Sequence, residues 1–383
     1  MIDSLNVSGG AESQLATNLS LFDHNHMEHR VAVTKRTVPN REREISRHAR
    51  IHHLTDEGEN LGRLRLTARL RRLVEEIEPT LVHASLSNSG LATRLLARGG
   101  RQVAAVESLV NISHEPIRAV DNPNVTTSKL RLHAAVDRLT MPYLSGYHAL
   151  SQAVADSWSR TIGLDPSLMT VIPRGVNLSR TDLGPSRVEA RYSVLEEFGL
   201  PDDVFLVLSV GRVEPQKGHR YLIEAMSRLL PEHPQVRLVI AGRPGNASPL
   251  VESAIERHQL DSIVHLAGPR RDIHRLLAAA DVFAFPSLFE GFGNALIEAM
   301  AVGLPVVTTR EPPMTDLISD DSVGIGVDRA DSEGLARAIE RLVADRGLRE
   351  RLGAAARARA ATLPSSKDVA AAHESWYERL LAG

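Results

Sequence analysis

The most informative absences in this 383-residue sequence are those of cysteine and of long apolar runs. Without cysteine the chain can form no disulfide, no thiolate nucleophile and no cysteine-ligated zinc site. No apolar run approaches the ~18 residues that a membrane-spanning helix needs. No charged segment followed by an apolar stretch, as in a secretory signal, opens the sequence. We therefore expect a cytoplasmic protein.

An excess of charge of one sign is also missing. The 45 basic and 47 acidic residues leave a formal net charge of −2, which gives no general attraction to a polyanion. We expect no nucleic-acid partner. Lysine is scarce within the basic set, because only four of the 45 residues are lysines. This bias slightly favours a chemical role for Lys217, which follows a predicted strand.

Length and patterning indicate two α/β domains. A chain of 383 residues exceeds the usual size of a single hydrophobic core. Strand-like apolar runs alternate with helical patterns, which is typical of parallel sheets. The expected strands are 2–5, 30–33, 80–84, 102–107, 148–150 and 169–172 in the first half, and 204–210, 237–241, 263–266, 282–285, 305–308 and 323–327 in the second.

Turn-forming residues place the domain boundaries. Asp182-Leu183-Gly184-Pro185 favours a linker, so we expect a first domain over 1–180, a linker over 181–199 and a second domain over 200–362. Leu363-Pro364 interrupts the chain before a last helix within 363–383. The first strand is short for a sheet interior, from which we expect the natural reading frame to begin upstream of Met1.

The segment Glu290-Gly-Phe-Gly-Asn-Ala-Leu-Ile-Glu298 carries the strongest functional signal. It lies between a predicted strand and a helix, and we expect the backbone N–H groups of residues 294–296 to be free. Free donors at a helix N-terminus favour an anion, and the glycines allow a ligand to approach the main chain. Carboxylates accept hydrogen bonds from vicinal hydroxyls. The layout predicts a site for a phosphorylated, polyhydroxylated small molecule.

A second loop, from Gly211 to Gly218, follows the predicted strand 204–210. It presents Arg212 and Lys217 at the carboxyl end of a parallel strand, where open α/β sheets bind ligands. Both cations suit phosphate oxygens. The order of residues is not that of a Walker loop. A surface charge after a turn is the alternative interpretation.

At these two sites the sequence resembles the family-4 retaining glycosyltransferases of GT-B fold, also called glycosyl transferases group 1. Further segments that resemble the family are 8–12, 151–154, 171–177, 281–287 and 298–307. The resemblance implies an α/β fold of two Rossmann-like domains facing across a cleft. It also implies a C-terminal helix that crosses back to the first domain.

The implied function is transfer of a hexose-type sugar from a nucleotide-diphosphate donor to a glycan, lipid-linked or small-molecule acceptor, with retention. Cell-surface polysaccharide synthesis is the default context. The resemblance assigns catalysis to Arg212, Lys217 and Glu290, with no metal and no cofactor. It implies that the donor is bound by Gly9, Gly10, Gly211, Arg212, Lys217, Glu290, Gly291, Phe292, Gly293, Asn294, Ala295, Leu296 and Glu298.

Acceptor contacts are expected from the first domain. His83 and Glu107 fall at the ends of predicted strands and are candidates, as is His114. Many family members carry a functional histidine after the strand that here ends at Glu107, but His114 falls later than that position. The role of any histidine is therefore open.

Other functions stay open. A sugar epimerase or a glycan phosphorylase could share the fold, and a catalytically silent homologue could act as a partner protein. The predicted helix 61–77 carries five arginines on one side and a leucine-rich stripe on another. One interpretation is peripheral contact with anionic lipid at the inner face of the membrane. The other, which we favour, is a helix that packs on the sheet with solvated arginines.

Overall fold

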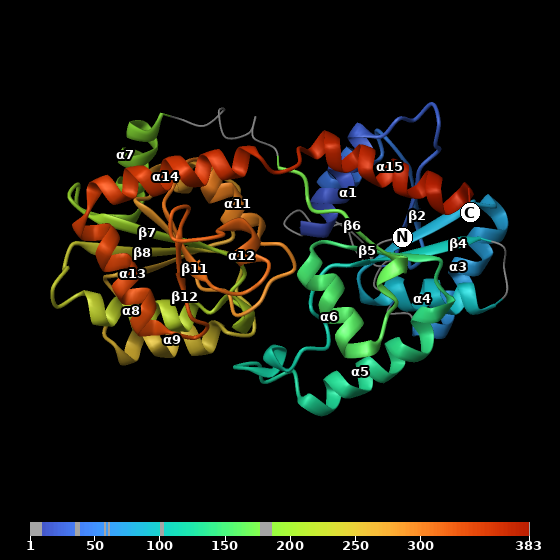
Figure 1. Ribbon diagram of the computed structural model, residues 1–383, viewed down its shortest axis with the longest axis horizontal. Helices are drawn as coiled ribbons and strands as arrows, with labels where there is room; N and C mark the ends of the chain where they lie inside the picture. Colours follow the sequence, from blue (N-terminus) through green and yellow to red (C-terminus); the bar gives the residue numbers. More distant parts are fainter. Residues whose placement is uncertain are drawn as a thin grey trace. The chain divides into compact units, whose positions relative to one another are not determined.

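The chain folds into two α/β units (Figure 1). The computed structural model describes residues 10–34, 39–56, 59, 62–99, 103–176 and 186–382. The first unit comprises residues 1–115, 128–175 and 364–383, and the second comprises 116–127 and 176–363. The stretch 116–127 therefore belongs to the second unit, although we expected it in the first domain.

Parallel strands form the sheets of the first unit. β1 (Arg30–Val33) pairs with β2 (Arg50–His53). A four-stranded sheet has the order β3 (Leu81–Ser85), β4 (Ala104–Leu109), β5 (Gly146–Ala149) and β6 (Met169–Val171). The sequence did not predict β2, because Arg-Ile-His-His holds one apolar residue and no apolar alternation. The strand expected over 2–5 lies outside the described residues.

The helices of the first unit are α1 (Gly10–Leu21), α2 (Pro39–Ile45), α3 (Arg63–Ile77), α4 (Ser87–Arg98), α5 (Thr127–Thr140), α6 (Gln152–Ile162) and α15 (Ser366–Ala382). α15 is the expected crossover helix. It packs against α1 and buries Val369, Ala370, His373 and Trp376. The last residues of the chain thus complete the core of the unit that its first residues begin.

α3 is the basic helix whose role the sequence left open. Its buried residues, Leu66, Leu70 and Val74 among them, form the packed stripe that the pattern predicts. Arg69 forms an ion pair with Glu59 at 2.8 Å. Within the described part of the chain, no helix combines the length and the apolar character needed to cross a bilayer.

The second unit holds one six-stranded parallel sheet with helices on both faces (Figure 1). Its order is β12 (Ile325–Val327), β11 (Val306–Thr309), β10 (Val282–Phe285), β7 (Phe205–Val210), β8 (Val236–Ala241) and β9 (Val264–Gly268). β7 and β10 are adjacent, and Val207 pairs with Val282. The strand order reverses direction between these two strands, where open α/β sheets bind their ligands.

The helices of the second unit are α7 (Arg187–Phe198), α8 (His219–Leu229), α9 (Ser248–Arg257), α10 (Ile273–Ala279), α11 (Asn294–Ala301), α12 (Met314–Leu317), α13 (Ser332–Ala344) and α14 (Arg346–Ala361). We expected a linker over 181–199; residues 181–185 lie outside the described residues, and α7 occupies most of the rest, where the expectation is wrong. This helix begins in a capping box of Ser186 and Glu189 and packs against α10. Arg191 ties it to Asp281 at 2.8 Å.

Candidate functional site

The loop between β7 and α8 carries Lys217 on a preformed turn. A short 3₁₀ helix, Pro215–Lys217, precedes Gly218, whose φ of 65° is left-handed. A Cβ at Gly218 would lie 2.1 Å from the carbonyl oxygen of Pro286, so no larger residue fits there. The aliphatic stem of Lys217 lies against Gly211, where a Cβ would be 3.1 Å from its Cδ. Gly218 therefore allows the tight turn after Lys217, and Gly211 leaves room for the lysine stem.

The loop between β10 and α11 carries the Glu-Gly-Phe-Gly segment. Gly293 is the N-cap of α11 with a φ of 89°, which is left-handed. The Leu296 amide donates to the Gly293 carbonyl at 3.0 Å, so our expectation of a free amide is wrong for Leu296. The amides of Asn294 and Ala295 remain as candidate donors to an anion. Asn294 Oδ1 is buried and, among the described residues, lacks a hydrogen-bond partner.

Gln216 joins these two loops. The Leu288 amide donates to the Gln216 carbonyl at 2.7 Å, and Gln216 Nε2 donates to the Phe289 carbonyl at 2.9 Å. On the neighbouring strand β11, Thr309 Oγ1 donates to the Ser287 carbonyl at 2.7 Å. Residues far apart in the sequence are thus joined by hydrogen bonds at one edge of the sheet.

This edge brings Lys217 and Glu290 into direct contact. Lys217 Nζ lies 2.5 Å from Glu290 Oε1, and their side chains are 19% and 9% exposed. Lys217 Nζ also lies 5.0 Å from the centroid of the Phe285 ring, a cation–π geometry. The sequence predicted both residues as site residues but not their pairing.

Arg212 lies on the same loop but at the surface. Its side chain is 60% exposed, and Nη1 is 3.4 Å from Glu214 Oε1. Glu298 is exposed on α11. The predicted set therefore divides into a partly buried pair, Lys217 and Glu290, and two solvent-facing charges, Arg212 and Glu298.

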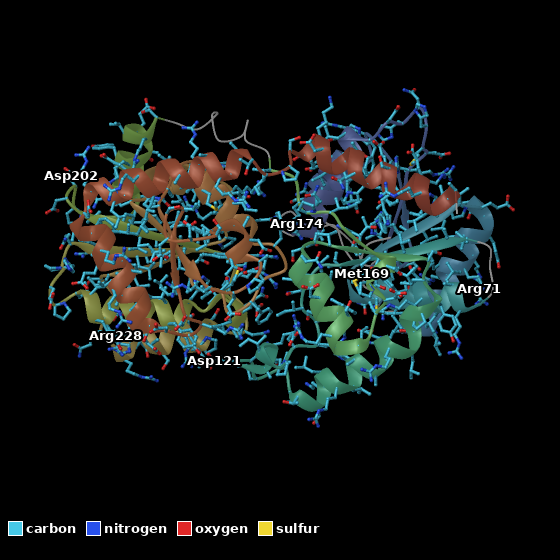
Figure 2. The ribbon with its side chains drawn as sticks, viewed as in Figure 1. Arg71, Asp121, Met169, Arg174, Asp202 and Arg228 are labelled. Atoms are coloured by element: carbon cyan, nitrogen blue, oxygen red, sulfur yellow. The ribbon has the colours of Figure 1, made fainter. Side chains whose placement is uncertain are left out.

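Residues 116–127 add groups that the sequence did not single out. The guanidinium of Arg118 lies 5.5 Å from the centroid of the Phe289 ring. Burial lowers the pKa of Arg118. Asp121, labelled in Figure 2, accepts hydrogen bonds from Arg220 at 3.0 Å and from the Tyr221 hydroxyl at 2.8 Å. No sequence signal could have found these contacts, because they depend on how an irregular segment docks.

His219, the first residue of α8, is also new to the candidate set. It is 2% exposed, and its Nδ1 lacks a partner within the described residues. Burial, together with the charge of Lys217, lowers its pKa to about 3. His219 is therefore neutral at physiological pH and adds no cation to the site.

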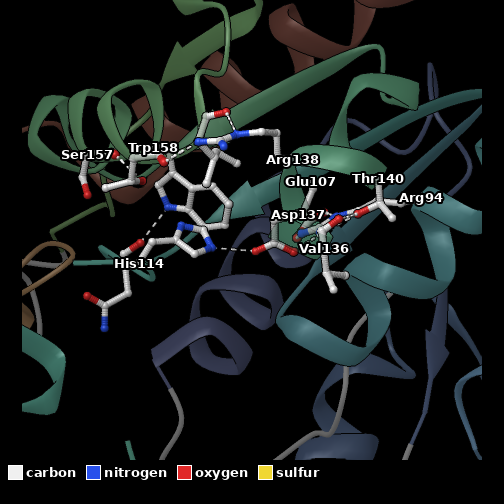
Figure 3. A network of polar contacts seen from close by, with 12 residues as sticks. Arg94, Glu107, His114, Val136, Asp137, Arg138, Thr140, Ser157 and Trp158 are labelled. Carbon is white, nitrogen blue, oxygen red and sulfur yellow. Dashed lines mark hydrogen bonds and ion pairs between the residues drawn. The ribbon is translucent and has the colours of Figure 1, made fainter. Parts of the chain in front are cut away.

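In the first unit, Glu107 and His114 belong to one buried network rather than to an open acceptor site (Figure 3). Arg94 donates to the two carboxylate oxygens of Glu107 at 2.6 and 2.7 Å, and also binds Asp137. His114 Nε2 lies 2.8 Å from Asp137 Oδ2. Because Arg94 holds both Glu107 oxygens, we assign Glu107 a structural role.

The charged groups of this network stabilise one another in their ionised forms. Burial alone would lower the pKa of Arg94, but the carboxylates of Glu107 and Asp137 raise it overall. Burial alone would raise the pKa of Asp137, but the hydrogen bond from His114 and the charge of Arg94 lower it overall. The ion pairs are therefore intact at neutral pH.

His83 lies within β3 and forms part of a hydrogen-bond chain that reaches α15. The Tyr377 hydroxyl is 2.7 Å from His83 Nδ1, and His83 Nε2 is 2.7 Å from Ser108 Oγ. Ser108 Oγ is 2.9 Å from His148 Nδ1, whose Nε2 is 2.7 Å from the Ile172 carbonyl. Since that carbonyl can only accept, one assignment satisfies every link, with each group from Tyr377 onward donating to the next.

The remaining predicted residues are placed as follows. Gly9 lies outside the described residues, and Gly10 is the first residue of α1. Gly211, Gly291, Phe292 and Ala295 lie on the two loops or at the start of α11. Phe292 is buried.

Comparisons with known proteins add to this geometry. A model described as Glycosyltransferase Family 4 matches residues 8–180, and one described as Glycosyl transferases group 1 matches residues 193–359. A D-inositol 3-phosphate glycosyltransferase of Xylanimonas cellulosilytica is 37% identical over 216 residues, which are 55% of this chain and 51% of that protein. The lipopolysaccharide core biosynthesis glycosyltransferase LpsE of Rhizobium meliloti is 40% identical over 152 residues, which are 40% of this chain and 43% of that protein.

The aligned part spans about half the length of these relatives, 51% of one and 43% of the other. Among solved structures, Anabaena HepE in complex with UDP and glucose superposes with a TM-score of 0.81 at 21% identity, covering 98% of each chain. At that identity the likeness concerns the fold.

Proposed function

Because this chain belongs to the family-4, group 1 glycosyltransferases and has their GT-B fold, we propose that it transfers a hexose-type sugar from a nucleotide-diphosphate donor with retention of configuration. The observation that carries this proposal is the contact between Lys217 and Glu290 at 2.5 Å. It sets a phosphate-binding cation beside a hydroxyl-binding carboxylate, as the junction of a sugar and a diphosphate requires.

The proposed roles follow from chemistry and exposure. Lys217 neutralises the diphosphate from within the site, and Arg212 from its surface. Glu290 accepts hydrogen bonds from hexose hydroxyls, and Glu298, exposed on α11, accepts them from the ribose. The amides of Asn294 and Ala295 add donors at the start of the helix.

In the proposed reaction, the bond between the anomeric carbon and the β-phosphate oxygen breaks, and both electrons stay on that oxygen. The acceptor oxygen then bonds to the same face of the carbon, and its proton passes to the departing phosphate. The leaving group gains negative charge, so cations already in place stabilise the transition state more than the ground state. No protein nucleophile is needed, and side-chain cations take the place of a divalent metal.

For the acceptor we propose a glycan, a lipid-linked intermediate or a small polyol. The names of two relatives refer to D-inositol 3-phosphate and to the lipopolysaccharide core. A first screen of acceptors should therefore include a polyol phosphate and a lipid-linked glycan. Because α3 is basic, the proposal also includes peripheral contact of this helix with anionic lipid.

The test is a panel of nucleotide sugars incubated with the purified protein and these acceptors, with release of nucleoside diphosphate as the readout. We expect release from one donor class, an α-linked product from an α-linked donor, and unchanged rates after EDTA treatment. Inversion would overturn the stereochemical proposal. Loss of activity that Mg²⁺ or Mn²⁺ restores would overturn the charge assignment. Absence of both binding and release across the panel would overturn the function.

A further inference from the structure

The pairing of Lys217 with Glu290 creates a conflict of charge within the proposed site. The lysine that should attract a diphosphate is already neutralised by a carboxylate at 2.5 Å. Both groups are largely shielded from solvent, because the Lys217 ammonium lies 5.0 Å from the centroid of the Phe285 ring and the two side chains are 19% and 9% exposed. A phosphate that binds Lys217 must therefore lie close to the charge of Glu290.

The cost of that proximity depends on whether a sugar is attached. In a poorly solvated site, a carboxylate without hydrogen-bond donors strongly repels a neighbouring phosphate. An intact nucleotide sugar brings hydroxyl donors to Glu290, which offset the repulsion. A free nucleoside diphosphate brings no such donors and carries one more negative charge than its sugar ester.

We propose that the Lys217–Glu290 pair is a charge gate that makes the protein prefer the intact nucleotide sugar over the free nucleoside diphosphate. The gate rests on the proposed function, and it adds a selectivity that sugar contacts alone do not imply. After transfer, the same repulsion favours release of the nucleoside diphosphate. Glu290 thus has two effects: it binds the sugar of the donor, and it weakens binding of the nucleoside diphosphate product.

The experiment compares affinities for UDP, GDP and ADP, and for their glucose esters, by calorimetry. With the nucleotide that the unmodified protein prefers, we expect Glu290→Gln to bind the free diphosphate about 10-fold more tightly. It should bind the glucose ester no more tightly than the unmodified protein does. The ratio of the two dissociation constants should therefore fall about 10-fold.

Two further variants separate charge from shape. Glu290→Asp keeps the negative charge and should not tighten diphosphate binding. Glu214→Gln removes the carboxylate beside Arg212. The Arg212 side chain is 60% exposed and that of Glu214 is 19% exposed, so solvent screening at the arginine should limit the effect of the substitution to less than about 3-fold. Thermal melting of each variant establishes that it is folded.

The possible outcomes distinguish failure of the charge gate from failure of the proposed glycosyltransferase function. If Glu290→Gln is folded and binds the free diphosphate no more tightly than the unmodified protein, the gate is wrong although the proposed function stands. If Glu290→Asp or Glu214→Gln tightens binding as much as Glu290→Gln does, charge at Glu290 is not the cause and the gate is also wrong. If the unmodified protein binds neither nucleotides nor nucleotide sugars, the proposed function itself fails.

Discussion

At the scale of single residues, Lys217 is the best-positioned cation of the proposed site. Its side chain is 19% exposed, and its ammonium contacts Glu290 and lies over the Phe285 ring. A cation that is fixed before the reaction needs no reorganisation when charge develops on the leaving group. The charge of Arg212, at 60% exposure, is better screened by solvent.

We predict that Lys217→Ala lowers kcat/KM by ~10²–10³, which corresponds to ~3–4 kcal/mol of transition-state stabilisation. Arg212→Ala should lower it less, because solvent already screens its charge. Steady-state kinetics with the preferred donor measures both. Near-normal activity of Lys217→Ala would show that the diphosphate lies elsewhere.

Arg94 shows how a buried charge acts on stability instead. Its side chain is 4% exposed and depends on Glu107 and Asp137 for charge compensation. We predict that Glu107→Gln lowers the free energy of unfolding by about 3 kcal/mol, because one partner of a buried pair is lost. Urea denaturation is the measurement. Glu333→Gln is the control, since its pair with Arg337 is exposed and should contribute less than ~1 kcal/mol.

At the scale of elements, a chain of neutral polar groups fastens α15 to the first unit's sheet. Burial lowers the pKa of His148 to about 3, and it also lowers the pKa of His83 and that of His373. These histidines bind protons more readily in the unfolded chain, whose histidines titrate near 6.5. Their contribution to stability is complete above that pH and is lost as the pH falls toward the folded values.

We therefore predict that the free energy of unfolding falls between pH 7.5 and pH 5, with His148 alone contributing about 2 kcal/mol of the loss. His148→Gln cannot be protonated and should flatten the pH dependence. His133→Gln, at an exposed position, should leave it unchanged. Parallel pH profiles for all three proteins would contradict the role of the buried histidines.

At the scale of the whole molecule, three separate segments of the chain build the first unit. Residues 364–383 return to it after the second unit is complete. α15 supplies Val369, Ala370, His373 and Trp376 to the core there, so the first unit should not fold without the chain's last 20 residues.

We predict that a chain ending at Leu363 loses the protected amides of the first unit but keeps those of the six-stranded sheet. Hydrogen exchange resolved by peptide distinguishes the two units. A chain ending at Leu381, which is 47% exposed, serves as the control and should behave as the full chain does. Retained protection in β3 to β5 of the shorter chain would show that α15 is dispensable.

The sequence by itself determined the α/β class, most strands and the positions of the two candidate loops. Buried parallel strands such as β7 and β10 are continuous apolar runs, and glycines mark the turns that follow them, so local patterns carry this information. β2 was not predicted because its sequence is polar. α7 was not predicted because the turn-forming residues before it are typical of a linker, although the capping box of Ser186 and Glu189 can be recognised in the sequence.

Only the tertiary structure decided which of those residues meet. Lys217 and Glu290 lie 73 positions apart and are joined because β7 and β10 are neighbours in the sheet. Glu107 reads in the sequence as an exposed strand end, yet it is neutralised by Arg94, which reaches it from the adjacent α4. Local sequence determines which charges a loop carries, but strand order determines which charges come together, and electrostatic energy depends on that distance.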